Sequence, residues 1–177
     1  MASTPVIPVP IPNKVLIASD HAGFELKEYI KTELGADFPF VDLGTLSKDS
    51  VDYPDIADQL CQKLIADQRL AYSNTTLFGI LICGSGVGIC IRANRYPQIR
   101  AVQIWSEDIA KLSREHNDAN VACFGERVQD KVECLNMLET FLNTKFLGEN
   151  AAKVGSVNAA AIRHLKRVKK LSVPVKV

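Results

Sequence analysis

The chain has 177 residues and a net charge of +1, with an apolar fraction of 47% and a charged fraction of 23%. This length is enough for one domain with a substantial core. The charge lacks the basic excess of a nucleic-acid binder, and no window approaches the ~18 consecutive apolar residues of a membrane span. The composition therefore indicates an ordinary globular enzyme or binding domain.

Residues 1–13 alternate proline with small or branched residues, and they lack the basic start and apolar stretch of a signal peptide. We predict an extended arm here. The chain has an odd number of cysteines, and no close pair has the spacing of a zinc site. All except Cys83 are expected to be buried, reduced thiols of a cytoplasmic protein. They are Cys61, Cys90, Cys123 and Cys134.

The first predicted strand, 14–19, is a continuous apolar run of the kind found in buried parallel strands. Apolar residues at helical spacing predict a helix over 24–34 that ends at Gly35. A second strand is predicted over 38–43. A polar loop, 44–53, follows, and Pro54 begins a helix that runs to about residue 67.

The second half of the chain continues this alternation. A third strand, 76–82, leads into a glycine-rich loop and a short helix over 89–95. A fourth strand is predicted over 100–104. Ser106 is a good N-cap for a helix to residue 114. A fifth strand over 120–124 and a helix over 130–142 complete the pattern.

Five strand–helix alternations predict an α/β fold: a single Rossmann-like three-layer domain with a five-stranded parallel sheet and helices on both faces. We assign residues 14–147 to this domain. Residues 148–177 form a C-terminal tail with a basic helical segment over 163–171, which we expect to pack on a partner subunit. Ligands of such folds bind beyond the carboxyl ends of the strands.

The loop after the third predicted strand, Cys83-Gly84-Ser85-Gly86-Val87-Gly88, has glycine at every second position. Glycines let backbone N–H groups converge on an anion, and the following helix directs its positive end to the same point. A thiolate is also favoured at that position. The loop lacks the Lys-Ser/Thr of a phosphate-binding P-loop and the spacing of the dinucleotide fingerprint.

Polar side chains that could support chemistry occur near other strand ends. His21 and His116 are expected at functional ends of strands, and imidazole titrates near neutrality. Asp20 could instead serve only as a helix N-cap. Arg127 could bind an anion or lie on the surface as an ordinary cation. No cluster suggests a metal site.

Six short motifs occur in order along the predicted domain. They are SDHAGFELK (19–27), DYP (52–54), ICGSGVGI (82–89), IRAV (99–102), SREHNDAN (113–120) and FGERV (124–128). Each motif is modest, but their combination is specific. In this combination the chain resembles the type B ribose-5-phosphate isomerases over about residues 14–147. The family interconverts ribose 5-phosphate and ribulose 5-phosphate, a step of the non-oxidative pentose phosphate pathway.

The resemblance implies a role for each matching residue. Cys83 is the implied base that moves a proton between C2 and C1. The enediolate oxygen is held by Ser85 and by backbone N–H groups of Gly84, Gly86, Val87 and Gly88. His116 helps to open the furanose ring. The remaining groups contact the sugar (Asp20, Tyr53 and Asn117) or the phosphate (His21 and Arg127).

The resemblance also implies a homodimer or tetramer whose active site lies at a subunit interface, and it implies no cofactor. The tail departs from the family pattern, because the arginine motif expected soon after residue 148 occurs only at Arg163-His164-Leu165-Lys166-Arg167-Val168. We expect about a dozen inserted residues and assign Arg163 and Arg167 to the substrate. Without the insertion, Lys153 is the basic residue left for that role, and the segment 163–170 is a solvated basic helix.

Two other functions remain open from the sequence. Galactose 6-phosphate or allose 6-phosphate isomerases carry out the same chemistry on a longer sugar. A non-catalytic regulator that binds a sugar phosphate could share the fold, since fold alone does not fix function. The presence of Cys83, Ser85 and His116 favours an enzyme. Arg92 stands where the family has a small residue, and the sequence offers no reason for it.

Overall fold

The computed structural model describes residues 14–70, 77–149 and 159–173. The predicted arm (1–13) and Lys153 lie outside them. The strands are β1 (Lys14–Ser19), β2 (Phe40–Asp42), β3 (Leu77–Cys83), β4 (Ala101–Gln103) and β5 (Val121–Gly125). The helices are α1 (Phe24–Leu34), α2 (Tyr53–Leu70), α3 (Val87–Ala93), α4 (Glu107–Asn117), α5 (Lys131–Asn143) and α6 (Ala159–Leu171), with 3-10 turns η1 (His21–Gly23) and η2 (Leu147–Glu149).

The five strands form one parallel sheet in the order β2-β1-β3-β5-β4. This confirms the predicted fold class. The chain runs from β1 outward to β2, then crosses back to place β3 on the other side of β1. The strand order thus reverses between β1 and β3, which is where open α/β sheets bind ligands. The predicted order of elements did not reveal that β5 lies between β3 and β4.

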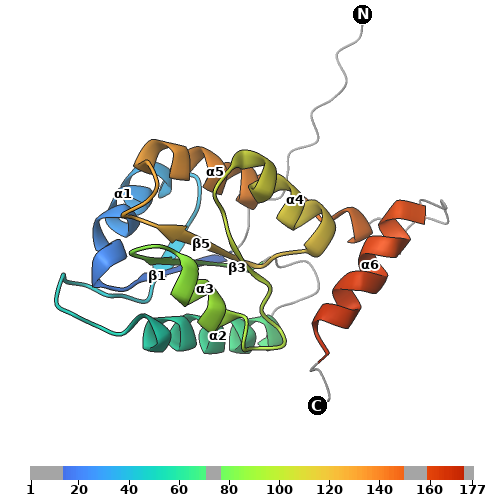
Figure 1. The fold of residues 1–177 in the computed structure, drawn as a ribbon, viewed down its shortest axis with the longest axis horizontal. Coiled ribbons are helices and arrows are strands. Elements are labelled where there is room, and N and C mark those ends of the chain that lie inside the picture. The colour runs from blue at the N-terminus through green and yellow to red at the C-terminus, as the bar shows by residue number, and fades with distance from the viewer. Residues whose placement is uncertain (1–13, 71–76, 150–158, 174–177) are drawn as a thin grey trace, which may run out of the picture.

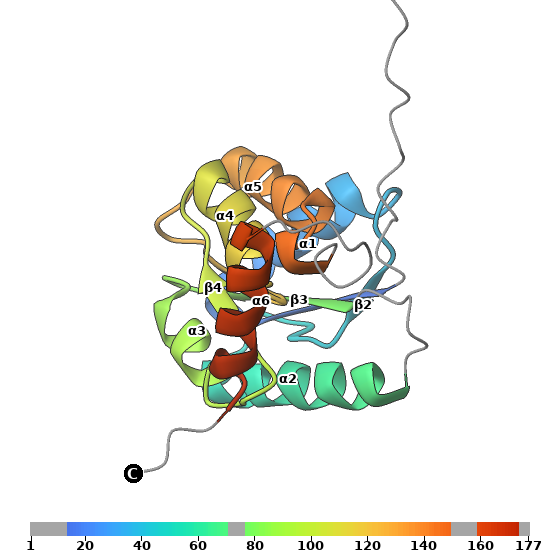
Figure 2. The same cartoon turned by 90° about the vertical axis from the view of Figure 1, so that its right-hand side faces the viewer.

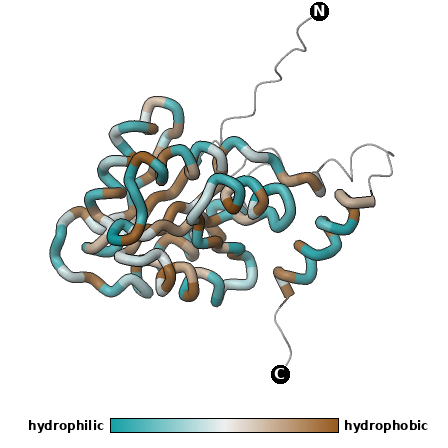
Figure 3. Tube along the Cα trace, turned by 45° about the horizontal axis from the view of Figure 1, so that its top comes forward, coloured by the Kyte–Doolittle hydropathy of each residue, from teal (hydrophilic) through white to brown (hydrophobic). Residues whose placement is uncertain are grey.

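Two helical layers cover the sheet (Figures 1 and 2). Apolar residues of α1, α4 and α5 pack on one face, and those of α2 and α3 pack on the other. Alternate strand residues supply the two cores; for example, Ile17 belongs to the first and Leu16 to the second. Figure 3 shows the apolar residues along the strands at the centre of the molecule.

The observed bounds differ from the predicted ones mainly at edges and helix ends. β2 and β4 are shorter than predicted because each is an edge strand with a single pairing neighbour. Helix α3 begins earlier, directly after Gly86, and helix α4 continues past residue 114 to Asn117. It then ends at Asp118, which adopts the left-handed conformation with a φ of 49°.

Helix α6 lies beside the end of the sheet rather than on either helical layer (Figures 1 and 2). It contacts η2 and α4 of its own chain. Its buried side chains are Ala161, His164 and Val168, which lie on one face at helical spacing. Among the described residues, no helix is long and apolar enough to cross a membrane.

Candidate active site

The ends of β1 and β3 bring the first site residues together. The backbone N–H of Asp20 donates to the carbonyl of Ile82, 3.1 Å away, so Asp20 lies beside the residue that precedes Cys83. The Asp20 carboxylate is almost fully buried and accepts from the N–H groups of Ala22 and Gly23. It therefore caps η1, as the alternative interpretation of this residue anticipated, and also lies at the point where the strand order reverses.

Cys83 is the last residue of β3 and is 4% exposed. Its Sγ accepts a hydrogen bond from the N–H of Gly86 at 3.1 Å, so the loop folds back over the sulfur. The exposed Ser85 hydroxyl lies 3.3 Å from the N–H of Val87. The glycine loop thus places a buried thiol, a hydroxyl and the first turn of α3 within one short segment. Backbone N–H groups in such a loop stabilise negative charge.

Two glycines are required for this loop to lie against the end of β5. Gly86 has a φ of +77°, and a Cβ on it would meet the backbone of Phe124 at 2.9 Å. A Cβ on Gly125 would come within 2.4 Å of the backbone carbon of Ser85. The loops after β3 and β5 therefore pack backbone to backbone, and side chains at these positions would separate them.

The same close packing brings Tyr53 and Arg127 to the loop. The ring of Tyr53 lies 2.7 Å from the position of a Cβ on Gly88, and the guanidinium of Arg127 lies 3.3 Å from that on Gly84. The backbone N–H of Arg127 also donates to the carbonyl of Gly84. An aromatic ring therefore lies beside one end of the loop and a guanidinium, a group that binds anions, beside the other.

His21 begins η1, directly after Asp20, and its Nδ1 lies 3.2 Å from the carbonyl oxygen of Val51. The pKa of the Asp20 carboxyl is raised by burial, although its backbone hydrogen bonds and the nearby His21 and Arg127 partly offset that effect. The two cationic groups therefore lie close enough to Asp20 to act on its charge. An anion bound there would have both of them as neighbours.

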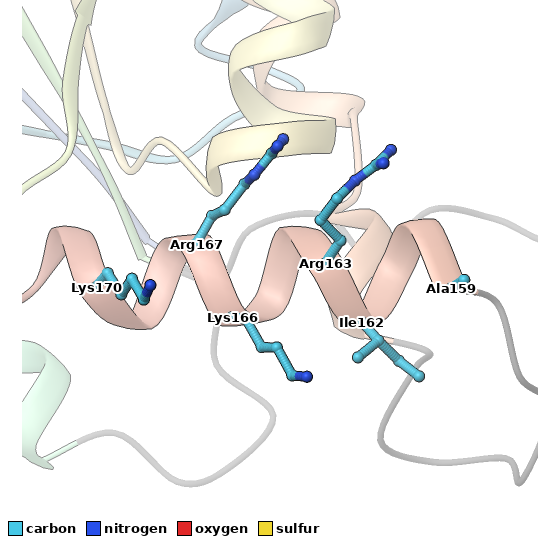
Figure 4. A pocket seen from close by; sticks show the side chains of 6 residues that line it. All are labelled: Ala159, Ile162, Arg163, Lys166, Arg167 and Lys170. Atoms are coloured by element: carbon cyan, nitrogen blue, oxygen red, sulfur yellow. The ribbon is translucent and has the colours of Figure 1, made fainter.

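The structure does not bring His116 and Asn117 to this edge, which corrects the expectation that His116 lies at a functional strand end. Both residues are at the C-terminal end of α4. Because α4 runs back against the strand direction, this end lies at the opposite, amino edge of the sheet. There α6 adds Arg163 and Arg167, both exposed and pointing to the same side in Figure 4.

One chain therefore carries two separate groups of predicted site residues. The carboxyl-edge group contains Asp20, His21, Tyr53, the loop Cys83–Gly88 and Arg127. The amino-edge group contains His116, Asn117, Arg163 and Arg167. Along β3, the register pairs Cys83 with Gly125 but Gly79 with Val121. The two groups are therefore separated along the strand direction by at least four strand residues, or about 13 Å, and the turn between α4 and β5 adds to this distance.

Several supporting residues were not found from the sequence. The Gln103 amide donates to the carbonyl of Ser85 at 2.8 Å, and the Gln129 amide accepts from the N–H of Gly125 at 2.7 Å. The Glu126 carboxylate accepts from the N–H of Leu26 and so ties the β5 loop to α1. Only Glu126 had a signal, because it belongs to the FGERV motif. The Gln103 contact depends on strand order, and the Gln129 contact depends on how the chain turns after β5.

Arg92 has a structural explanation. Its guanidinium makes a two-pronged ion pair with Asp58 of α2, at 2.7 and 2.6 Å, and the Tyr96 hydroxyl donates to the same carboxylate. This contact lowers the pKa of the Asp58 carboxyl. Arg92 thus joins α2 to α3, the helix that follows the glycine loop, and lies outside both groups of site residues.

The cysteines are all free, and the expected burial holds for Cys61, Cys123 and Cys134 but not for Cys90. Burial raises the pKa of Cys61 and that of Cys134 to about 12, which keeps these thiols protonated. Cys90, which is partly buried, hydrogen-bonds to Cys123, and this contact lowers the pKa of Cys90. In the part of the chain that the structure describes, no three His, Cys, Asp or Glu side chains are grouped to hold a metal ion.

Comparison with known proteins shows where this arrangement belongs. The Ribose/Galactose Isomerase family model matches residues 15–158. The ribose-5-phosphate isomerase B of Escherichia coli is 37% identical over 136 residues, which cover 76% of this chain and 87% of the relative's length. A probable ribose-5-phosphate isomerase B from Mycoplasma pneumoniae is 37% identical over 148 residues, covering 82% of this chain and 93% of the relative.

Solved structures agree with these sequence matches. Ribose 5-phosphate isomerase B from Anaplasma phagocytophilum has a TM-score of 0.74 and 40% identity, covering 91% of this chain and 97% of its own. The enzyme from Mycoplasma genitalium, solved with bound ribulose-5-phosphate, has a TM-score of 0.73 and 34% identity, covering 90% and 93%. The resemblance inferred from the six motifs is therefore confirmed, and the chain belongs to the Ribose/Galactose Isomerase family.

Proposed function

We propose that this protein interconverts D-ribose 5-phosphate and D-ribulose 5-phosphate as an aldose–ketose isomerase of the non-oxidative pentose phosphate pathway. The observation that carries the proposal is the buried Cys83 thiol at the strand-order reversal, with the N–H of Gly86 directed at its sulfur. The relative from Mycoplasma genitalium, whose structure holds ribulose-5-phosphate, supports this substrate.

In the proposed reaction, Cys83 removes a proton from C2 of the aldose and returns it to C1, while the hydroxyl proton on O2 passes to O1. Negative charge develops on the carbonyl oxygen as the enediolate forms. Ser85 and the backbone N–H groups of Gly84 to Gly88 stabilise that charge, and one such donor contributes about 3 kcal/mol to lowering the barrier. The proton remains on one residue between the two carbons, so the reaction needs no cofactor.

The remaining residues of the carboxyl edge position the substrate. Asp20 and Tyr53 line the sugar, while His21 and Arg127 bind the phosphate. Arg127 lies across Gly84, and the electrostatic effects of His21 and Arg127 on the pKa of Asp20 support this placement. Binding the phosphate far from C1 and C2 provides energy that orients the reacting carbons.

We further propose that the active unit is at least a homodimer in which the amino-edge group of one chain completes the carboxyl-edge site of another. His116 would open the furanose ring there, Asn117 would contact the sugar, and Arg163 and Arg167 would add cations for the phosphate. Their separation from Cys83 within one chain supports this arrangement. In this dimer, residues 14–147 form the isomerase domain and residues 148–177 form a tail that packs on the partner. We also propose that the enzyme acts in the cytoplasm.

Isomerisation of ribose 5-phosphate, followed with EDTA present, tests the proposal. We expect activity in the native chain and a loss of about 10³-fold or more in Cys83→Ala, because the base is removed. Cys134→Ala is the matched control, since that buried thiol lies on α5 in the core of the opposite sheet face. It should retain most of the activity.

The other outcomes separate the alternatives. A native chain that is inactive on ribose 5-phosphate but active on galactose 6-phosphate or allose 6-phosphate would replace the substrate and keep the chemistry. Inactivity on all three, with retained binding of a sugar phosphate, would instead indicate a non-catalytic regulator. Full activity in Cys83→Ala would remove Cys83 from the role of base.

A further inference from the structure

The amino-edge group contains a contact between two histidines that no sequence motif indicates. The rings of His116 on α4 and His164 on α6 lie face to face, with centroids 4.3 Å apart and planes inclined by 4°. The ring of His164 also hydrogen-bonds to the backbone of His116. His164 thus contacts His116 through both its face and its edge, which fixes the ring more tightly than stacking alone.

His164 is the buried member of this pair and lies between exposed arginines. It is 7% exposed, while Arg163 and Arg167 on the same helix are exposed. Figure 4 shows both arginine side chains on one side of α6, away from Ile162 and Lys166. The position of His164 against α4 therefore also sets where these two cations lie relative to His116.

The neighbours of His164 favour its neutral form. Burial lowers its pKa most, and the positive charges of His116, Arg163 and Arg167 lower it further, while the hydrogen bond to the His116 backbone raises it by less. A neutral ring can stack on His116 without repulsion, whereas two stacked imidazolium rings would repel each other. His164 is thus suited to hold His116 in place without adding a second positive charge beside it.

We propose that His164 is a positioning residue, which orients the ring of His116 and aligns Arg163 and Arg167 with it so that the three reach one substrate together. The inference rests on the proposed isomerase function and adds to it a residue that touches no substrate atom. The inference also explains why the arginine motif can occur later in this chain than in the family pattern. Stacking of His164 on His116 brings α6 to α4, and this contact does not depend on the length of the segment that precedes α6.

Two readouts test the inference, and both use the full-length protein. The chain has only three histidines, so the imidazole C2 protons give three NMR signals that single substitutions assign. In His164→Ala the signal of His116 should shift, because the neighbouring ring is lost. The kcat/KM for ribose 5-phosphate should fall about tenfold, since a stacked pair and a hydrogen bond are removed together.

Two further variants distinguish positioning from general packing. His164→Phe keeps a stacking ring and should retain kcat/KM within about threefold of the native value, which is the smaller loss expected when only the hydrogen bond is removed. Val168→Ala removes apolar packing from the same buried face of α6, one turn away, without touching His116. It should leave both kcat/KM and the His116 signal close to native.

The three variants together test whether His164 positions His116. Native kinetics in His164→Ala would overturn the inference, and so would equal losses in His164→Ala, His164→Phe and Val168→Ala, since only helix packing would then matter. These results leave the proposed function intact as long as the native chain isomerises ribose 5-phosphate and Cys83→Ala does not. Inactivity of the native chain would instead refute the proposed function.

Discussion

The two groups of site residues are held in place by different means. At the carboxyl edge, Cys83, Gly84 and Arg127 follow strand ends, and backbone hydrogen bonds between neighbouring loops fix them. At the amino edge, His116 and the arginines of α6 project from helices, and a stacked pair of side chains joins those helices. The first group is therefore part of the sheet framework, whereas the second depends on how one helix docks.

The largest effect expected from this division is complementation between inactive variants. Cys83→Ala damages only the carboxyl-edge group, and His116→Ala only the amino-edge group. If a site takes one group from each chain, a mixed dimer has one intact site. Unfolding and refolding an equal mixture should then restore about a quarter of the native activity, because about half the dimers are mixed and each keeps one of its two sites.

A second mixture provides the control. Cys83→Ala and Ser85→Ala damage the same group, so mixing them should restore nothing. Activity that stays at the level of the separate variants in the first mixture as well would show that the two groups do not meet across a subunit interface. Measuring the mass of the assemblies in solution alongside activity would show whether mixed dimers had formed at all.

The next largest effect is expected on stability, from the buried ion pair between Lys27 and Asp42 near the carboxyl edge. Lys27 is fully buried and pairs with Asp42 at 2.6 Å; Asp42 also pairs with Lys31 and accepts from the N–H of Gly44 at 2.9 Å. Asp42→Ala leaves the Lys27 charge with one fewer partner. We expect a loss of about 3 kcal/mol in the free energy of unfolding, measured with denaturant.

This variant should affect the two groups unequally. Gly44 accepts from the N–H of Ser19 and begins the loop that leads to Val51, the contact of His21. The KM for ribose 5-phosphate should therefore rise, while the NMR signals of His116 and His164 stay in place. Glu25→Ala, which removes an exposed ion pair with Lys48, is the matched control and should change stability little. An equally stable Asp42→Ala would show that the buried network carries little of the folding free energy.

The same division explains what the sequence could and could not predict. Continuous apolar runs such as 14–19 identify buried parallel strands, and strand ends then identify the carboxyl-edge residues, because that edge is where the fold places ligands. The position of His116 depended on how far α4 extends and on its direction against the sheet. A prediction that stops the helix at residue 114 leaves His116 in a turn before the fifth strand, and we therefore expected it at a functional strand end, which is the wrong edge of the sheet.

Tertiary contacts between distant segments left no signal in the sequence. Gln103 of β4 reaches Ser85 across the end of β5, which lies between β3 and β4, and alternation of elements does not specify this strand order. His164 lies in a segment whose many cations are typical of a solvated helix, but it is buried where α6 docks against α4 and η2. The resemblance predicted roles for Arg163 and Arg167. The stacking of His164, which lies between them in the sequence, on His116 became evident only from the structure.

The smallest expected effect is a pH dependence confined to the amino edge. The pKa of His164 is lowered when α6 is docked, so the undocked helix takes up a proton more readily. Docking is therefore fully favourable above the ordinary histidine pKa of 6.5 and is weakened progressively as the pH falls below it. Burial causes most of this lowering of the His164 pKa, and the charges of His116 on α4 and of Arg163 and Arg167 on α6 add to it, whereas the hydrogen bond to the His116 backbone opposes it.

Thermal unfolding at pH 7.5 and at pH 5.5 would measure this effect as a difference between variants. The native chain should lose more stability between these values than His164→Phe, whose ring stacks but does not titrate. Carboxylates elsewhere, including Asp20 with its raised pKa, contribute equally to both proteins and cancel in the comparison. Identical losses of stability in the two proteins would mean that His164 has the same pKa in the docked and the undocked helix. Docking of α6 would then not depend on pH between 7.5 and 5.5.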